Sequence, residues 1–223
     1  MLTFAFDVYG TLVDTAGVAR ALSAWVDDAN AFALRWREKH LEYAFRRGLM
    51  RHYRPFDGCA RDALVAVCAE RAPHIPAAAR DELMHAFAAL PLFADAARVL
   101  PKLADAHNCR LFAFSNGPRE AVRQLLTANN ALEFFTEVVS VEDTALFKPA
   151  PEVYAHFLHC AKAPAKEVWL VSSNPFDIAG ARAVGWRAAW LQRGSGDWEP
   201  WPEKEFAPTA IISCLDDLAA ATE

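Results

Sequence analysis

Short apolar runs alternate along the chain with stretches in which apolar residues recur at helical spacing. The first run, Leu2–Phe6, is too short for a free helix and is bounded by Asp7 and Gly10, so we interpret it as a buried strand. Later runs of this kind lie at Arg110–Phe114, Glu137–Val141, Val168–Val171, Arg187–Leu191 and Ile211–Ile212. Helical stretches separate them. Strands that alternate with helices predict an α/β protein whose parallel sheet is covered on both faces.

A long helical region interrupts this alternation after the first predicted strand. It covers Thr15–Leu90, and its clearest segment runs over Asn30–Tyr53, after which Pro55 and Gly58 are expected to break the helix. Further helices are predicted at Arg61–Arg71 and Ala77–Leu90. We therefore expect two parts, a core formed by residues 1–14 and 92–223 and an inserted α-helical cap formed by residues 15–91.

Polar residues follow the first four predicted strands. In a parallel sheet of this kind, the ligand site lies beyond the carboxyl ends of the strands. The polar residues at these ends are Asp7, Ser115, Asn116, Lys148, Ser172, Ser173, Asn174 and Asp177. We expect the four loops that carry them to meet at one edge of the sheet, with the cap above that edge.

The composition limits the functions that are open to the chain. Its 223 residues include 54% hydrophobic and 23% charged residues, which excludes a disordered protein. The net charge is −5, whereas proteins that bind nucleic acid or membrane surfaces are usually basic, so neither partner is expected. The first ten residues lack the basic region of a signal peptide. The five cysteines form no CxxC pair, which favours a reducing, cytoplasmic location.

Four motifs in this order resemble those of the haloacid dehalogenase superfamily. They are FAFDVYGTLVD at Phe4–Asp14, FSNG at Phe114–Gly117, KP at Lys148–Pro149 and VSSNPFD at Val171–Asp177. The resemblance spans nearly the whole chain. It implies a Rossmann-like core with an inserted cap, and it makes Asp7 the nucleophile. The superfamily contains mostly phosphatases and a minority of dehalogenases.

Tyr9 separates these two activities. Phosphatases of the superfamily carry a second Asp at this position as a general acid, because the alkoxide leaving group of a phosphate ester needs a proton. A tyrosine, with an ordinary pKa of about 10, is a poor substitute for that acid. A halide is the conjugate base of a strong acid and leaves without a proton. Tyr9 therefore favours a dehalogenase.

The fourth motif supports the same conclusion. Phosphatases place one or two acids there to help hold Mg²⁺, which prefers carboxylate and other oxygen ligands. Here Ser172, Ser173 and Asn174 stand in the early positions, and only Asp177 is acidic. We expect a site without a metal or cofactor in which Lys148 neutralises the carboxylates, although Asp7 and Asp177 could still bind Mg²⁺ weakly.

The cap segment Trp36–Tyr43 resembles the corresponding segment of the L-2-haloacid dehalogenases. Arg37 matches the halide-binding arginine of that family, and Leu41 lies beside it on the same helical face. The resemblance implies a halide cradle formed by Arg37, the amide of Asn116 and the ring edge of Phe176. Residues 35–54 hold seven basic and two acidic residues, however, and such a run is usually a solvated helix face. That alternative stays open for Arg37.

The expected mechanism proceeds through an aspartyl ester. Asp7 attacks C2 of a short 2-haloacid and displaces the halide, and water then releases the 2-hydroxy acid. Lys148 keeps Asp7 ionised, and Asp177 pairs with Lys148 and helps to activate the water. The remaining assignments are hydrogen bonds from Ser115 to the substrate carboxylate, from Thr11, Ser172 and Asn174 to Asp7 and the ester, and from Tyr154 to Asp7 or water. A tyrosine buried in the core is the alternative for Tyr154.

These observations predict a metal-independent (S)-2-haloacid dehalogenase, a hydrolase acting on carbon–halide bonds. Its partners would be a small anionic 2-haloacid or haloacetate and the halide product, with a homodimer also compatible with the sequence. Two other functions stay open at this point. One is a Mg²⁺-dependent phosphatase that acts on a small phosphate ester, and the other is a binding protein of the same fold without catalytic activity.

Overall fold

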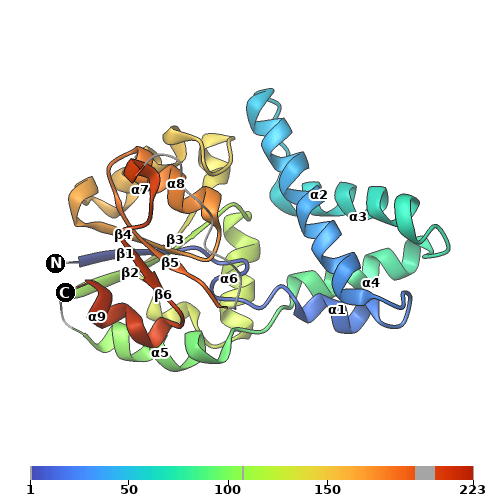
Figure 1. The fold of residues 1–223 in the computed structure, drawn as a ribbon, viewed down its shortest axis with the longest axis horizontal. Helices are drawn as coiled ribbons and strands as arrows, with labels where there is room; N and C mark the ends of the chain where they lie inside the picture. The colour runs from blue at the N-terminus through green and yellow to red at the C-terminus, as the bar shows by residue number, and fades with distance from the viewer. Residues whose placement is uncertain (1, 107, 194–203, 223) are drawn as a thin grey trace.

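A computed structural model describes residues 2–106, 108–193 and 204–222. Within these residues the strands form one parallel sheet in the order β3-β2-β1-β4-β5-β6 (Figure 1). The strands are β1 (Leu2–Phe6), β2 (Cys109–Ser115), β3 (Glu137–Ser140), β4 (Val168–Ser172), β5 (Arg187–Leu191) and β6 (Ala210–Ile212). The predicted α/β class and the parallel sheet are confirmed.

Strand β1 lies at the centre of the sheet and sets the position of the site. It is an apolar run because both of its faces are covered, and Phe6 has no exposed surface. The register places Phe6 opposite Ala113 of β2 and Val171 of β4. Asp7 therefore leaves the sheet at the same level as the ends of both neighbouring strands.

Helices cover both faces of the sheet, with α5, α6 and α9 on one face and α7 and α8 on the other (Figure 1). Their bounds are α5 Ala94–Asp105, α6 Arg119–Ala128, α7 Pro151–Ala161, α8 Pro175–Ala183 and α9 Leu218–Thr222. Short 3-10 turns lie at Leu132–Phe134, Val141–Thr144, Ala165–Glu167, Lys204–Phe206 and Leu215–Asp217. Proline opens both α7 and α8, at the helix position where a backbone N–H is not needed.

Four further helices stand beside the sheet and extend away from it (Figure 1). They are α1 (Gly17–Leu22), α2 (Ala29–Leu49), α3 (Phe56–Arg71) and α4 (Ala77–Ala88). They enclose a hydrophobic cluster of their own, with Leu22, Trp36 and Leu64 among its buried members. Among the described residues, no helix combines the length and apolar character needed to cross a lipid bilayer.

Gly58 does not break the chain into separate helices, so this detail of the prediction is wrong. Helix α3 begins at Phe56, directly after Pro55, and Gly58 is its third residue. A glycine inside a helix costs about 1 kcal/mol relative to alanine. Helix α3 offsets that cost by burying an apolar face that includes Leu64 and Val67. The preceding helix, α2, ends at Leu49 rather than at Tyr53.

Candidate active site

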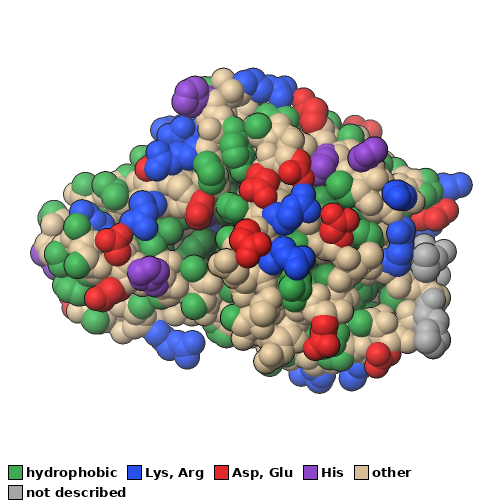
Figure 2. Space-filling model, turned by 180° about the vertical axis from the view of Figure 1, so that it is seen from behind, with side chains coloured by type: hydrophobic (Ala, Val, Ile, Leu, Met, Phe, Trp, Pro, Cys, Tyr) green, Lys and Arg blue, Asp and Glu red, His purple; other side chains and the backbone are tan. Residues whose placement is uncertain are grey.

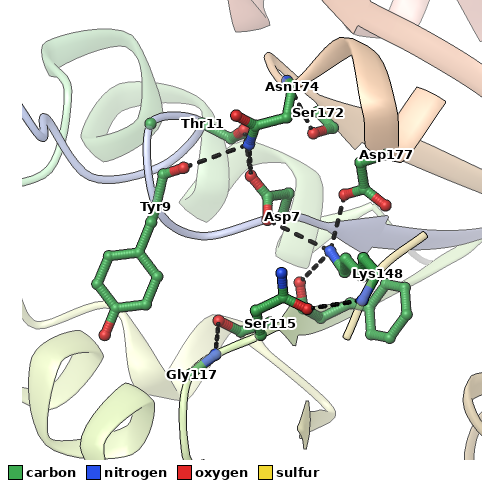
Figure 3. Close-up of polar contacts among 12 residues, drawn as sticks. Asp7, Tyr9, Thr11, Ser115, Gly117, Lys148, Ser172, Asn174 and Asp177 are labelled. Atoms are coloured by element: carbon green, nitrogen blue, oxygen red, sulfur yellow. Dashed lines mark hydrogen bonds and ion pairs between the residues drawn. The ribbon is translucent and has the colours of Figure 1, made fainter. Parts of the chain in front are cut away.

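Three side chains from three separate loops hold the Asp7 carboxylate at the end of β1 (Figure 3). Thr11 Oγ1 and Asn174 Nδ2 donate hydrogen bonds of 2.8 and 2.7 Å to Oδ2. Lys148 Nζ lies 3.3 Å from Oδ1. The carboxylate is almost buried, with 7% of the residue exposed. These contacts fix its orientation and place it beside an ammonium group.

Lys148 lies between two carboxylates. In addition to Asp7, its Nζ donates to Asp177 Oδ2 at 2.8 Å and to the Phe114 carbonyl at 2.8 Å, so the pair predicted between Lys148 and Asp177 is present (Figure 3). Burial raises the pKa of Asp177, while the ammonium of Lys148 acts in the opposite direction. Because a buried charge needs a partner, the lysine stabilises both carboxylates at once.

Tyr154 does not contact Asp7, so that part of the prediction is corrected. Its hydroxyl donates to Asp177 Oδ1 at 2.8 Å, and the side chain is fully buried. The reason is that α7 packs against α8, which carries Asp177. Both oxygens of Asp177 therefore have donors, from Lys148 and Tyr154. Activation of water by Asp177 stays a prediction.

The serine residues at the strand ends contact backbone amides. Ser115 Oγ accepts from the Gly117 amide at 3.0 Å, and Ser172 Oγ accepts from the Asn174 amide at 3.1 Å (Figure 3). Ser172 thus acts on the Asn174 loop and not on Asp7 itself. Asn116 Oδ1 accepts from the backbone amide of Lys148 at 2.9 Å, which leaves its amide group available to the cavity described next. The role predicted for Ser115 stays a prediction.

A small cavity lies directly above Asp7, between the sheet edge and the helices α2 and α3. Its lining residues are Asp7, Tyr9, Arg37, Leu41, Phe56, Asn116, Asn174 and Phe176. The structure therefore brings the predicted halide cradle and the nucleophile to one small cavity. Phe56 is a residue that the sequence analysis missed, since nothing in its local sequence distinguishes it from a packing residue.

Arg37 points inward and joins the helical part to the sheet. Its Nη2 donates to Asn174 Oδ1, the amide that also holds Asp7. Burial lowers the pKa of Arg37, and the nearby Asp7 partly counteracts this effect. An arginine stays protonated in proteins, so Arg37 adds a positive charge to the cavity wall.

The other basic residues of the run 35–54 form ion pairs, so the solvated-face interpretation applies to them and not to Arg37. The pairs are Arg35 with Glu38 and Glu70, Lys39 and Arg46 with Glu42, Arg47 and Arg54 with Asp62, and Arg51 with Glu152. Arg37 has no ion pair within the described part of the chain. Figure 2 shows acidic and basic side chains intermixed on the back of the molecule.

Tyr9 forms an apolar wall of the cavity. Its ring stacks on Phe87 with the centroids 5.4 Å apart. Burial raises the pKa of the Tyr9 hydroxyl above its ordinary value, and the carboxylate of Asp7 contributes to the increase. The group two residues after Asp7 is therefore even less able to protonate a leaving group than a solvated tyrosine.

Phe176 forms another wall, and Phe45 of α2 supports it from behind. The two rings meet edge to face, with centroids 5.1 Å apart and an interplanar angle of 77°. This geometry is favourable for aromatic pairs because a positive ring edge meets a negative ring face. Phe45 is a second residue that the sequence analysis missed.

The donors around the carboxylates do not fit a divalent cation. Asp7 Oδ2 and the Tyr9 carbonyl oxygen both accept from Asn174 Nδ2, at 2.7 and 3.4 Å, so an N–H donor bridges two oxygens that a cation would need. The other Asp7 oxygen faces an ammonium group. In the ranges 2–106, 108–193 and 204–222 there is also no group of three His, Cys, Asp or Glu side chains arranged to hold a metal.

Comparison with known proteins agrees with this geometry. The sequence pattern of the haloacid dehalogenase-like hydrolase family matches residues 1–185. The chain belongs to this family. The match confirms the resemblance that the four motifs of this haloacid dehalogenase-like hydrolase indicated.

This family member is similar to several named enzymes. It is 30% identical over 215 residues to an (S)-2-haloacid dehalogenase of Pseudomonas putida, covering 96% of this chain and 93% of that one. It is 32% identical to (S)-2-haloacid dehalogenase 4A of Burkholderia cepacia, covering 91% and 86%. A structure of the L-2-haloacid dehalogenase of Xanthobacter autotrophicus, with chloropropionic acid covalently bound, superposes with a TM-score of 0.89 at 28% identity and covers 100% of this chain and 98% of that one.

Proposed function

We propose that this protein is an (S)-2-haloacid dehalogenase that hydrolyses short L-2-haloalkanoic acids and haloacetates to 2-hydroxy acids and halide. The observation that carries the proposal is the buried Tyr9 beside a carboxylate nucleophile, because it leaves no proton donor for an alkoxide at the position where a phosphatase needs one. The names of the relatives support the same substrate class. A phosphatase is not favoured, since the donor set around Asp7 does not fit Mg²⁺.

In the first step, a carboxylate oxygen of Asp7 attacks C2 of the substrate from the side opposite the halogen. The new C–O bond forms as the C–halogen bond breaks, and the halide leaves with the electron pair toward Arg37, Asn116 and Phe176. The configuration at C2 inverts. Two cations, Lys148 and Arg37, balance the negative charges of the nucleophile and the substrate carboxylate. The covalently bound chloropropionic acid in the Xanthobacter relative supports such a step.

In the second step, water attacks the carbonyl carbon of the aspartyl ester. The hydroxyl of Thr11, the amide of Asn174 and the ammonium of Lys148 already surround this carboxyl group and stabilise the charge that develops on it. The ester C–O bond breaks on the acyl side. One proton of the water ends on the hydroxyl of the product, the other is released, and Asp7 is regenerated with one oxygen from water.

A pair of assays tests the proposal. Chloroacetate and L-2-chloropropionate are expected to release chloride in the presence of EDTA, while p-nitrophenyl phosphate stays intact. Phosphate release that requires Mg²⁺ would instead assign the protein to the phosphatases. Absence of turnover with every substrate would leave a binding protein.

The predicted division of the chain, its location and its oligomeric state belong to the same proposal. We assign residues 15–91 to a cap that covers the site, place the enzyme in the cytoplasm, and infer a homodimer. Limited proteolysis tests the division, and light scattering tests the dimer.

A further inference from the structure

Arg193, at the end of β5, contacts the loop that carries Thr11. Its Nη2 donates to the Thr11 carbonyl oxygen at 2.7 Å, and its Nη1 pairs with Asp95 Oδ2. The guanidinium also lies over the ring of Phe93, 4.1 Å from the centroid. Asp95 in turn accepts from the Leu215 amide at 2.9 Å. One partly buried ion pair thus connects the loop after β1 with the start of α5, the segment just after β5 and the turn at Leu215.

The chain passes between the sheet and the helices α1 to α4 twice, once in this loop and once at residues 91–93. The crossings pair with each other, since Phe93 N donates to Leu12 O and Asp14 N donates to Pro91 O, both at 2.9 Å. Arg193 therefore acts where the backbone of the helical insertion begins. Its neighbour Thr11 is fully buried and is held at its other end by the Ser173 amide, which donates to Thr11 Oγ1 at 2.9 Å.

We propose that Arg193 is a positioning residue for the nucleophile. It fixes the Thr11 carbonyl, the Ser173 amide fixes the Thr11 hydroxyl, and the hydroxyl donates to Asp7 Oδ2 at 2.8 Å. The proposal rests on the function proposed above, because it assigns Arg193 an effect on the attack by Asp7. A carboxylate that is displaced from the line of attack by about 1 Å loses rate by roughly 100-fold.

An arginine is needed at this position because two acceptors must be reached at once. The planar guanidinium donates to Asp95 with one nitrogen and to Thr11 with another, whereas all the donors of a lysine lie on a single nitrogen and cannot keep the spacing of these two contacts. With lysine the stronger, charged acceptor, Asp95, keeps its partner. The variant Arg193→Lys is therefore expected to keep the ion pair with Asp95 and to lose the contact with Thr11, so the effect of the Thr11 contact can be measured alone.

The test compares Arg193→Lys and Arg193→Met with Arg182→Met. Arg182 is a matched control, since its guanidinium also donates to two acceptors, the backbone carbonyls of Ala207 and Trp186, and has no hydrogen bond or ion pair with the loop after β1 among the described residues. For each variant we measure kcat and KM with L-2-chloropropionate, the melting temperature, and amide hydrogen exchange of the peptide that covers residues 8–13.

Both Arg193 variants are expected to lower kcat by about 10- to 100-fold with KM changed by less than about twofold, and to raise exchange in residues 8–13. Arg182→Met is expected to lower the melting temperature and to leave kcat and the amide exchange of residues 8–13 unchanged. Wild-type kcat in Arg193→Lys, or equal losses of kcat in Arg182→Met and Arg193→Met at a temperature where both are folded, would overturn the proposal. If the wild-type enzyme releases no halide, the proposed function fails, and unchanged exchange in the Arg193 variants would separately refute the contact.

Discussion

His40 lies inside the helical insertion, where its burial makes the stability of the protein depend on pH. The residue is 3% exposed, and its ring packs against Phe56 with the centroids 3.9 Å apart and the planes tilted by 39°. Nε2 lies 2.9 Å from the Phe56 carbonyl oxygen, so Nε2 is the protonated nitrogen. Burial lowers the pKa of His40 to about 3, and the charge of Arg37 adds to this effect, while the hydrogen bond to Phe56 opposes it. In the unfolded chain the pKa returns to about 6.5.

The sign of the effect follows from these two values. Between pH 6.5 and pH 3 the unfolded chain carries a proton on His40 that the folded protein does not, so lowering the pH favours unfolding. The stability linked to His40 is complete above about pH 6.5 and is lost as the pH falls toward 3. Each pH unit is worth about 1.4 kcal/mol, so the change from pH 7 to pH 5 removes about 2 kcal/mol of the free energy of unfolding.

Urea denaturation at pH 7 and pH 5 measures this loss, with His40→Gln as the control. Glutamine keeps an N–H donor for the Phe56 carbonyl and does not titrate. Carboxylates titrate in both proteins and cancel in the difference. The wild-type protein is expected to lose about 2 kcal/mol more than the variant. Equal losses, to within about 0.5 kcal/mol, would mean that His40 is not held neutral in the folded state and would refute the reasoning.

Three further variants test the site itself. Asp7→Asn is expected to lower halide release by at least about 1,000-fold and to prevent the mass increase of the ester in quenched reactions; turnover within tenfold of wild type would exclude Asp7 as the nucleophile. Tyr154→Phe removes the donor to Asp177 and should cost about 1.5–3 kcal/mol of stability, while a large loss of kcat at unchanged stability would place its hydroxyl on water instead. Arg37→Lys should weaken inhibition by bromide about tenfold, because lysine lacks the two spaced nitrogens with which a guanidinium can face Asn174 and a halide; unchanged inhibition constants would remove Arg37 from the cradle.

The strands of this protein could be predicted almost residue by residue, because each is an apolar run that polar residues terminate. The run at Val168–Val171 became β4, Val168–Ser172, and the run at Arg110–Phe114 became β2, one residue longer at each end. Because ligand sites of parallel sheets lie beyond the carboxyl ends of the strands, Asp7, Lys148 and Asp177 could be predicted to lie together. Helix ends were less predictable, as Gly58 illustrates, because tertiary burial outweighs a cost of about 1 kcal/mol.

Contacts between elements were the part that sequence spacing could not supply. The basic run around α2 seemed unbalanced only because its partners, such as Asp62 and Glu152, lie on other helices. The family resemblance implied a hydrogen bond from Tyr154 to Asp7 or water, yet helix packing directs its hydroxyl to Asp177. Arg193 carried a usable signal, since it stands just beyond the carboxyl end of a predicted strand.

Asn174 connects the helical insertion to the nucleophile. Its Nδ2 donates to Asp7 and its Oδ1 accepts from Arg37, so one side chain orients the nucleophile and holds the cavity arginine in place. Among the side chains that fit there, an amide can donate to a carboxylate and accept from a guanidinium at the same time. An aspartate would place a second negative charge beside Asp7 and would require a cation between the two carboxylates. The amide in the fourth motif therefore takes an arginine of α2 as its partner where a carboxylate would need a cation, and the same amide orients the attacking carboxylate.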